Sequence, residues 1–365
     1  MDIDDILYPT IEGGTIPDVI RCRTGLFSLD LALSHAGELG FPLRNIIELY
    51  GNEHIGKSSL AYWMAASVRE DGRVGIMDTE GALSKDYLRQ HFARAGFHGV
   101  VKVVDSAKKD KKGNLVPRQH SEMGTELADY LTQNEFNAVI LDSIGMWIPP
   151  AEAAGDIGDA NMGRRAQNIA QLVRRAASHL IVYHTPPKAV ILVNHSLQSF
   201  GVGGHYSPGG KTKNFARGVA LYMYVNDRQF PYGCWQIEVR VEKLRVGGTY
   251  KERIGQVFFI PAFGVAPHMT AVMDCFRLKL ANRTGGWVRY KEGDEWVVVG
   301  RMAELIEAEM EGNTEIFEPF HALLRDYEKQ LLEDNDGQEA DRGDDDGSDK
   351  VQDEGIGDRQ GPDES

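Results

Sequence analysis

The sequence predicts an α/β fold with a mixed, mainly parallel sheet, followed by a small α+β domain. Apolar, β-branched runs alternate with helical patterns in the first part of the chain, as in RNIIELYG, SSLAYWMAASVRED, RVGIMD, NAVILDS and AVILVNH. Strands that are apolar along their whole length are typical of a parallel sheet covered by helices on both faces. After Gly218, the runs VALYMYV, WQIEVRVEKLRV and GQVFFIP have short connections, which predicts antiparallel strands that extend the same sheet.

The length and composition indicate an ordinary globular protein. The chain has 365 residues, of which 42% are hydrophobic and 26% charged, and this balance excludes a fibrous or wholly disordered chain. No apolar run reaches the ~18 residues that a membrane span needs, and the N-terminus is acidic where a signal peptide would be basic. We therefore expect a cytoplasmic protein with no membrane partner. Cys22, Cys234 and Cys275 lack ligand spacing, so we expect buried thiols rather than a zinc site.

Composition divides the chain into four predicted parts. Residues 1–20 precede the patterned core, which covers 21–266. A smaller domain, 267–332, combines short strands with two amphipathic helices at its end. Residues 333–365 hold 14 acidic and three basic side chains, a charge of −11 within a total of −14. This tail has almost no apolar residues, so we predict that it is disordered.

The clearest motif is G-x-x-x-x-G-K-S, which directly follows the strand RNIIELY and opens a helix. Its glycines let backbone N–H groups surround a triphosphate, Lys57 reaches the β- and γ-phosphates, and the Ser58 hydroxyl ligates Mg²⁺. The motif and the residue after it are Gly51, Asn52, Glu53, His54, Ile55, Gly56, Lys57, Ser58 and Ser59.

Two other predicted strands end in carboxylates. NAVILDS ends at Asp142, which fits the Walker B position that holds the water shell of the metal; a helix cap is the alternative. RVGIMD ends at Asp78 and is followed by Glu80, whose carboxylate can polarise the attacking water. The alternative for Glu80 is a solvated loop residue.

With these residues in place, the chain resembles the RecA family of recombinases from about Val19 to Leu332, with details closer to phage UvsX-like members. The segments TGLFSLDLALS, MDTEGALSKDY, DIGDANMGRRAQ and SPGGKTKNFARG are similar to family segments and occur in the same order. The resemblance implies a RecA-like P-loop ATPase core that uses ATP and Mg²⁺. It also implies a helical filament on single-stranded DNA that catalyses homologous pairing and strand exchange. A RecA-fold hexameric helicase and a non-catalytic paralogue or mediator are the rival interpretations.

The resemblance also assigns roles to residues near the nucleotide. Glu80 matches the catalytic glutamate of the family, and Tyr87 matches the tyrosine that stacks on adenine. Ser84 stands where the family has an aspartate that contacts the base. His195 occupies the position of a glutamine that senses the γ-phosphate, and its imidazole can donate one hydrogen bond to a phosphate oxygen. A structural histidine is the alternative.

Lys243 and Arg245 match a basic pair that reaches across a subunit boundary to the ATP of the neighbour. Cations two positions apart lie on the same face of a strand, so both can point at one phosphate group. Without the resemblance they would be an ordinary exposed strand face. The resemblance thus implies a homo-oligomer, in which the short segment 1–20 is expected to dock on the neighbour.

Two loops, about 155–165 and 197–213, match the loops that hold single-stranded DNA in the family. Glycines permit close approach of the backbone, aromatic rings can stack on bases, and cations neutralise phosphates. The alternatives are a core role for the methionine and a flexible loop without a ligand. Homologous duplex DNA, single-strand-binding proteins and mediator proteins are the further partners expected. The DNA-binding residues expected are Met162, Arg164, Arg165, Arg174, Phe200, His205, Tyr206, Gly209, Gly210, Lys211 and Lys213.

One basic segment has no counterpart in these motifs. AKKDKKGNLVPRQH, residues 107–120, carries four lysines around a Gly-Asn turn, which predicts an exposed hairpin or loop. It is either a solvated loop or a contact to nucleic-acid phosphates.

Overall fold

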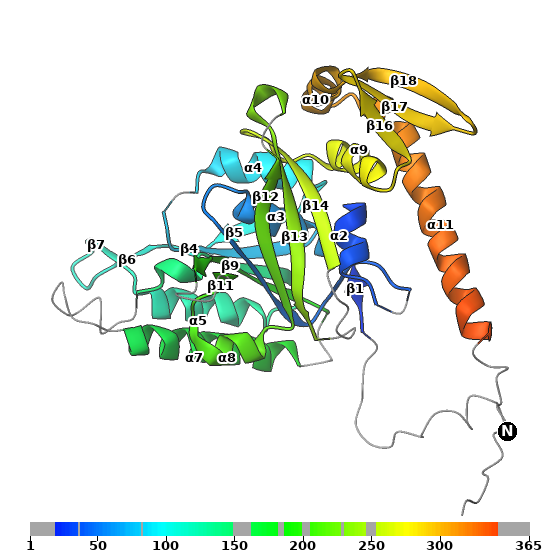
Figure 1. The fold of residues 1–365 in the computed structure, drawn as a ribbon. Helices are drawn as coiled ribbons and strands as arrows, with labels where there is room; N and C mark the ends of the chain where they lie inside the picture. The colour runs from blue at the N-terminus through cyan, green and yellow to red at the C-terminus, as the bar shows by residue number, and fades with distance from the viewer. Residues whose placement is uncertain are drawn as a thin grey trace, which may run out of the picture. The chain divides into compact units, whose positions relative to one another are not determined.

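The computed structural model describes residues 19–35, 37–81, 83–148, 162–181, 186–198, 205–227, 230–245 and 253–341 (Figure 1). The chain divides into two compact units, residues 1–324 and residues 325–365. All described strands belong to the first unit, so the candidate site lies within it.

A nine-stranded sheet forms the centre of the first unit, in the order β15-β14-β13-β12-β3-β9-β8-β4-β5. Neighbouring strands from β12 to β5 pair in parallel, whereas β13, β14 and β15 pair antiparallel. The mixed, mainly parallel sheet is therefore confirmed. Its strands are β3 (Asn45–Gly51), β4 (Arg73–Asp78), β5 (Val100–Val103), β8 (Phe136–Asp142), β9 (Ala189–His195), β12 (Val219–Asp227), β13 (Trp235–Leu244), β14 (Arg253–Ile260) and β15 (Gly264–Val265).

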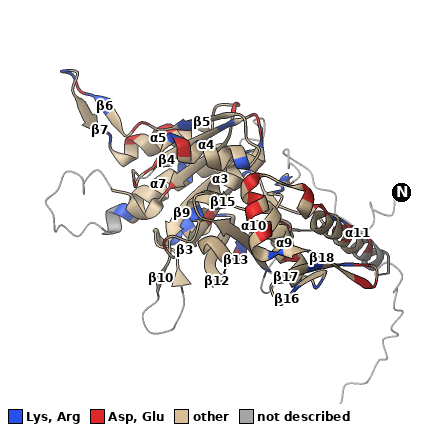
Figure 2. Cartoon of the chain, turned by 90° about the horizontal axis from the view of Figure 1, so that it is seen from above, with Lys and Arg blue, Asp and Glu red and all other residues tan. Residues whose placement is uncertain are grey.

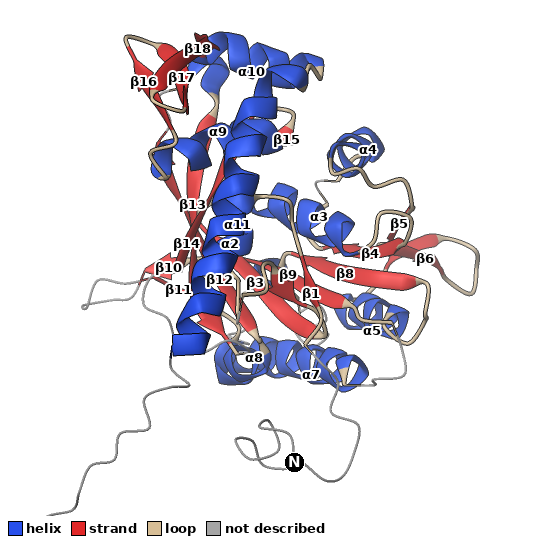
Figure 3. Cartoon of the chain, turned by 90° about the vertical axis from the view of Figure 1, so that its right-hand side faces the viewer, coloured by secondary structure: helices blue, strands red, loops and turns tan. Residues whose placement is uncertain are grey.

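Helices cover both faces of the parallel part of this sheet, as Figure 3 shows. Helix α3 (Lys57–Val68) and helix α4 (Lys85–Arg94) lie on one face, and α5 (His120–Tyr130) and α7 (Met162–Leu180) lie on the other. Successive strand residues therefore enter different cores: Ile140 packs with α3, whereas Val139 and Leu141 pack with α5 and α7. This burial on both sides explains why the strands are apolar without alternation.

The region after β15 forms a third core that is continuous with the sheet. Phe258 and Ile260 of β14 pack with residues of the helices and strands that follow, including Phe317. The boundary at residue 267 stays a prediction. The elements of this region are α9 (Pro267–Arg277), β16 (Ala281–Thr284), β17 (Trp287–Glu292), β18 (Glu295–Arg301), α10 (Met302–Glu311), η3 (Glu315–Phe317) and α11 (Glu318–Asp341).

Helix α11 differs from the expectation for the tail. It ends at Asp341, so residues 333–341 are helical although they belong to the segment predicted to be disordered. Extending an existing helix needs no new nucleation, and Glu, Gln and Ala in this stretch are good helix formers. Residues 342–365 lie outside the described residues.

Several small elements complete the described chain. Strands β6 (Ala107–Lys109) and β7 (Leu115–Pro117) pair as the expected hairpin, which projects with basic residues, coloured blue, near its tip (Figure 2). All three cysteines are buried and unpaired, as predicted. No helix within the described ranges has the length and apolarity to cross a membrane. The remaining elements are β1 (Arg21–Cys22), α2 (Phe27–Ala32), β2 (Phe41–Pro42), η1 (Ile144–Met146), β10 (Leu197–Gln198), β11 (His205–Tyr206), α8 (Gly210–Ala216) and η2 (Pro231–Gly233).

Candidate functional site

Two glycines shape the loop between β3 and α3. Gly56 has φ +97°, and a Cβ on it would lie 2.4 Å from Cε1 of Phe259. A Cβ on Gly51 would lie 2.3 Å from the carbonyl oxygen of Met223. Both positions therefore require glycine, because any side chain would collide with the neighbouring strands β12 and β14.

A cavity of about 500 Å³ lies at the carboxyl ends of β3, β4, β8 and β9. This edge of a parallel sheet is where ligands bind in open α/β folds. The cavity brings together most of the predicted nucleotide, metal and catalytic residues. It is lined by Glu53, His54, Ile55, Gly56, Lys57, Ser58, Ser59, Thr79, Glu80, Tyr87, Asp142, Ser143, Met146, Val193 and His195.

Lys57 opens α3 and is largely buried in the floor of this cavity. Its Nζ donates to the carbonyl oxygen of Asn52 at 2.6 Å. Burial lowers the pKa of Lys57, while Asp142 and Glu80 act to raise it. The ammonium is thus aimed across its own loop, where a phosphate can replace the carbonyl as its acceptor.

Asp142 ends β8 inside the same cavity. The hydroxyl of Tyr62 donates to Asp142 Oδ2 at 2.9 Å. Burial raises the pKa of Asp142, against the effect of hydrogen bonds from Ser58 and Tyr62. A hydroxyl and a buried carboxylate are hard oxygen donors, and a divalent cation beside them would offset the burial of the carboxylate. Ser58 and Asp142 therefore fit Mg²⁺ held together with a nucleotide.

Glu80 is held by hydrogen bonds yet remains partly open to the cavity. Ser143 Oγ donates to Glu80 Oε1 at 2.6 Å, and the backbone N–H of Glu80 donates to Asp78 Oδ1 at 2.9 Å. His195 Nε2 lies 3.5 Å from Glu80 Oε1. An oriented and partly exposed carboxylate can accept a proton from a water molecule in this cavity.

Tyr87 borders the cavity on the side of α4. Its hydroxyl lies 3.2 Å from Ser59 Oγ, and its ring centroid lies 4.0 Å from that of His91. Ser84 is the N-cap of α4, and its Oγ accepts a hydrogen bond from the backbone N–H of Tyr87 at 3.1 Å. Ser84 thus fixes the start of the helix that carries the tyrosine.

A second cavity of about 710 Å³ lies beside the first, and His195 lines both. The ring of His195 packs closely against Gly145, since a Cβ on Gly145 would lie 2.6 Å from His195 Cδ2. The buried Nδ1 of His195 has no hydrogen-bond partner among the described residues. The lining residues are Gly51, Asn52, Glu53, Ile144, Gly145, Arg165, Ala166, Ile169, His195, Ser196, Leu197, Pro208 and Gly209.

Only some of the predicted DNA-binding residues are brought to this second cavity. Arg165 and Gly209 line it, and Gly210 follows directly at the start of α8. Near it, the His205 ring stacks on Tyr222 at a centroid distance of 5.1 Å. Three others are exposed in the structure: Arg174, Tyr206 and Lys211.

Three predicted DNA contacts cannot be placed. Phe200 lies outside the described residues. Of Met162 and Arg164, only the backbone within α7 is described.

Lys213 corrects one prediction. Its side chain is fully buried, and its ammonium bonds to Glu48 inside the protein. It is therefore wrong to expect Lys213 to contact DNA phosphates in this arrangement, because no face of the side chain is open to a ligand.

Lys243 and Arg245 line neither cavity of their own chain. Lys243 Nζ donates to the carbonyl oxygen of Asn214 at 2.7 Å, and Arg245 donates to that of Phe215. Both cations thus bind the carboxyl end of α8. Their assignment to the nucleotide of a neighbour stays a prediction.

The sequence interpretation missed the residues that orient the site. Ser143, which positions Glu80, was signalled only by a hydroxyl directly after the strand-end Asp142. Glu48 had a stronger signal, since a charged residue in the middle of the strand NIIELYG needs a buried partner. The identity of that partner could not be read from the sequence.

Comparison with known proteins gives consistent matches. The family model described as the RecA N-terminal domain matches residues 12–259. The chain is 26% identical over 314 residues to protein RecA of Solidesulfovibrio magneticus, which covers 83% of this chain and 81% of the relative. It is 24% identical over 323 residues to protein RecA of Lactococcus lactis subsp. cremoris, covering 84% of this chain and 77% of the relative.

Proposed function

The chain belongs to the RecA family, as the match over residues 12–259 shows, and from this membership we propose its activity. It is a single-stranded-DNA-dependent ATPase that forms helical filaments on single-stranded DNA. The filament catalyses homologous pairing and strand exchange with duplex DNA in recombination and repair. The compartment is the cytoplasm, of a host cell if the protein is phage-encoded.

The observation that carries the proposal is the position of His195. This side chain borders the cavity of Lys57, Glu80 and Asp142, and it also borders the cavity lined by Arg165 and Gly209. When the imidazole of His195 donates to a phosphate oxygen in the first cavity, the position of the ring can alter the shape of the second cavity. This supports ATP-dependent DNA binding, since both ligands then act on one ring.

The residues around the first cavity suit the hydrolysis of ATP. Lys57 and the backbone N–H groups of its loop bind the β- and γ-phosphates, and Tyr87 packs against the base. Ser58 and Asp142 hold Mg²⁺, which when bound neutralises charge that develops on the phosphates. Glu80 accepts the proton of the attacking water, and Ser143 keeps its carboxylate oriented.

The proposed assembly of subunits uses an open edge of the central sheet. Strand β5 is the last strand of the described sheet, and Val100 and Val103 on it are exposed. A groove of about 620 Å³ lies beside it, lined by apolar residues that include Leu88, Phe92 and Phe97. An extended segment can add to such an edge and place its side chains in the groove. Residues 1–20 of a neighbour, with the apolar pattern of MDIDDILYP, are the proposed occupant.

Steady-state ATP hydrolysis with and without single-stranded DNA tests this function. We expect DNA to raise the rate at least about tenfold in the wild type, and we expect Lys57→Ala to abolish the stimulated rate. A hexameric helicase would show closed rings in electron micrographs taken under the same conditions. A non-catalytic paralogue would show no stimulated hydrolysis. Either result would contradict the proposal.

A further inference from the structure

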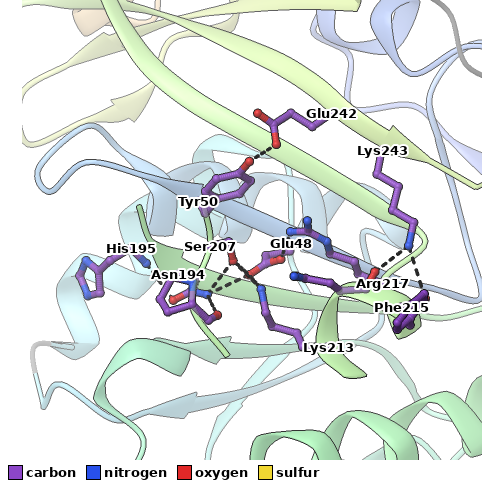
Figure 4. Close-up of polar contacts among 12 residues, drawn as sticks. Glu48, Tyr50, Asn194, His195, Ser207, Lys213, Phe215, Arg217, Glu242 and Lys243 are labelled. Atoms are coloured by element: carbon purple, nitrogen blue, oxygen red, sulfur yellow. Dashed lines mark hydrogen bonds and ion pairs between the residues drawn. The ribbon is translucent and has the colours of Figure 1, made fainter. Parts of the chain in front are cut away.

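Lys213, the last residue of the second predicted DNA loop, connects that loop to the middle of the central sheet. Its Nζ donates to Glu48 Oε1 and to Ser207 Oγ, and both charged side chains are fully buried. Figure 4 shows these groups converging on the carboxylate of Glu48. The two residues of the pair are 165 positions apart in the sequence.

Glu48 also contacts the strand that ends at His195. Asn194 Nδ2 donates to Glu48 Oε1 at 2.8 Å and to Ser207 Oγ at 2.9 Å. Asn194 Oδ1 accepts a hydrogen bond from the backbone N–H of His195 at 3.0 Å. One carboxylate on β3 therefore joins the strand of His195 to residues 205–217, which include the end of the second predicted DNA loop and helix α8.

The cluster holds two cations against one carboxylate. Arg217 bonds to Glu48 Oε2, and its own Nε is buried without a partner among the described residues. Burial lowers the pKa of Lys213 to about 8, although Glu48 acts to raise it. Burial acts to raise the pKa of Glu48, but Lys213 and Arg217 hold it below its ordinary value.

A buried ion pair of this kind contributes little net stability, because desolvation offsets the attraction between the charges. Its effect is on geometry: Lys213 has one position in which its charge is satisfied. Helix α8, which carries Lys213, is therefore fixed relative to β3 and β9.

The other end of α8 is bound by different cations. Lys243 donates to the carbonyl oxygens of Asn214 and Phe215, and Arg245 donates to that of Phe215. These are the two cations that the family resemblance predicts will bind the ATP of a neighbouring subunit. When they move there, the Glu48–Lys213 pair still holds α8 to the sheet, together with the bond from Arg217, the C-cap of α8, to the same carboxylate.

We propose that Glu48 and Lys213 are positioning residues that transmit the state of the nucleotide site to the DNA-binding segment. They fix α8, and with it the end of the second DNA loop, against the strands that carry the P-loop and His195. This inference rests on the proposed function, because it assumes that the chain binds DNA in an ATP-dependent way.

The test measures how strongly nucleotide controls DNA affinity. The readout is the ratio of affinities for a fluorescent oligothymidylate with a non-hydrolysable ATP analogue and with ADP, both with Mg²⁺, on the full chain. The variants are Lys213→Met, in which Glu48 keeps its ion pair with Arg217, the double variant Glu48→Gln with Lys213→Met, which removes both charges of the pair and also the carboxylate partner of Arg217, and Ser207→Ala, which leaves all charges in place.

Lys188→Met is the matched control. Lys188 is also buried, but its Nζ donates to the carbonyl oxygens of Leu131 and Gln133, away from the cluster. Its loss removes a buried ammonium of the same core without touching Glu48. A purely structural effect of losing such a lysine would appear equally in this control.

We expect the ratio to fall about tenfold in Lys213→Met and in the double variant, and about threefold in Ser207→Ala. Affinity for a fluorescent ATP analogue should stay within about twofold of wild type, and Lys188→Met should keep the wild-type ratio. Wild-type ratios in folded Ser207→Ala and the double variant would overturn the inference. A wild-type protein whose DNA affinity does not depend on nucleotide would instead overturn the proposed function.

Discussion

Two carboxylates at the nucleotide site have different surroundings, and this difference sets their roles. Asp142 is buried and accepts a hydrogen bond from Tyr62. It is therefore suited to bind a metal ion, whose charge replaces the stabilisation that water would give to the carboxylate. Glu80 is more than a third exposed at its side chain and accepts from Ser143, so it suits proton transfer with water. The same functional group, a carboxylate, thus serves two functions because burial differs.

Glu80→Gln should preserve binding of ATP and assembly on DNA while it lowers turnover by ~10² or more. The amide keeps the shape of the side chain and can still accept from Ser143, but it cannot take a proton from water. Steady-state hydrolysis and filament assembly check this. Asp86→Asn removes an exposed carboxylate on α4 and is the control. Normal turnover in Glu80→Gln would show that another residue is the general base.

Glu309 gives a pH-dependent prediction for stability. Burial raises its pKa to about 7, while its Oε2 accepts from the backbone N–H of Met269 at 2.8 Å. Because the folded state holds this proton more tightly than the unfolded state, the contribution to stability is complete below the ordinary pKa of 4.5 and is lost as pH rises from there through 7.

Glu309→Gln should remove that dependence. Between pH 6 and pH 8.5 the wild type should lose about 1 kcal/mol of unfolding free energy relative to the variant. Denaturant unfolding at the two pH values measures the difference. An equal loss in both proteins would show that Glu309 does not titrate in this range.

Among the elements, α8 connects the second predicted DNA-binding loop to the sheet that carries the nucleotide site. Its Lys213 bonds to the sheet, and its last carbonyl groups bind Lys243 and Arg245. The exposed Phe215 lies at the same end of the helix. A short helix held by cations at its carboxyl end is favoured by its dipole, so moving those cations weakens the end of α8.

Lys243→Ala and Arg245→Ala should impair hydrolysis only through the assembled state. Mixing either variant with Lys57→Ala protein should restore part of the activity, since one order of neighbours pairs an intact P-loop with an intact basic pair. The measurement is DNA-stimulated hydrolysis across mixing ratios. Mixtures that co-assemble yet stay as inactive as the separate proteins would contradict a shared site.

Much of the fold was predictable because its signals are local. The strand runs, the glycine-containing P-loop and the strand-end carboxylates each lie within a short window, and the sheet places them at one edge. The Glu48–Lys213 pair was not predictable, since only folding brings its members together. Lys213 follows a glycine-rich run, so its sequence context indicates an exposed basic loop, whereas α8 turns it into the core.

At the scale of the whole molecule, charge is unevenly distributed. Residues 333–365 carry −11, and the remaining chain carries 40 acidic and 37 basic side chains. Part of this acidic segment, residues 333–341, belongs to α11. An acidic segment competes with DNA phosphates for basic surfaces of the protein, over a distance of about 10 Å at 0.1 M salt.

Deleting residues 333–365 should strengthen binding to duplex DNA and lower the Mg²⁺ needed for strand exchange. Deleting only 342–365, which holds nine acidic and three basic residues, should have a smaller effect in the same direction. The difference from full length should shrink as salt rises. Affinities for duplex DNA, measured across a salt series, give this difference. Equal affinities of the full-length and truncated proteins at low salt would show that the tail serves only solubility.

The central claim is that ATP drives assembly of this chain on single-stranded DNA. Electron microscopy of the full chain with single-stranded DNA, Mg²⁺ and either ATP or ADP tests it most directly. The account predicts continuous, extended helical filaments with ATP for the wild type and for Glu80→Gln, and their loss with ADP or in Lys57→Ala. Closed rings, or filaments that form equally with either nucleotide, would contradict it.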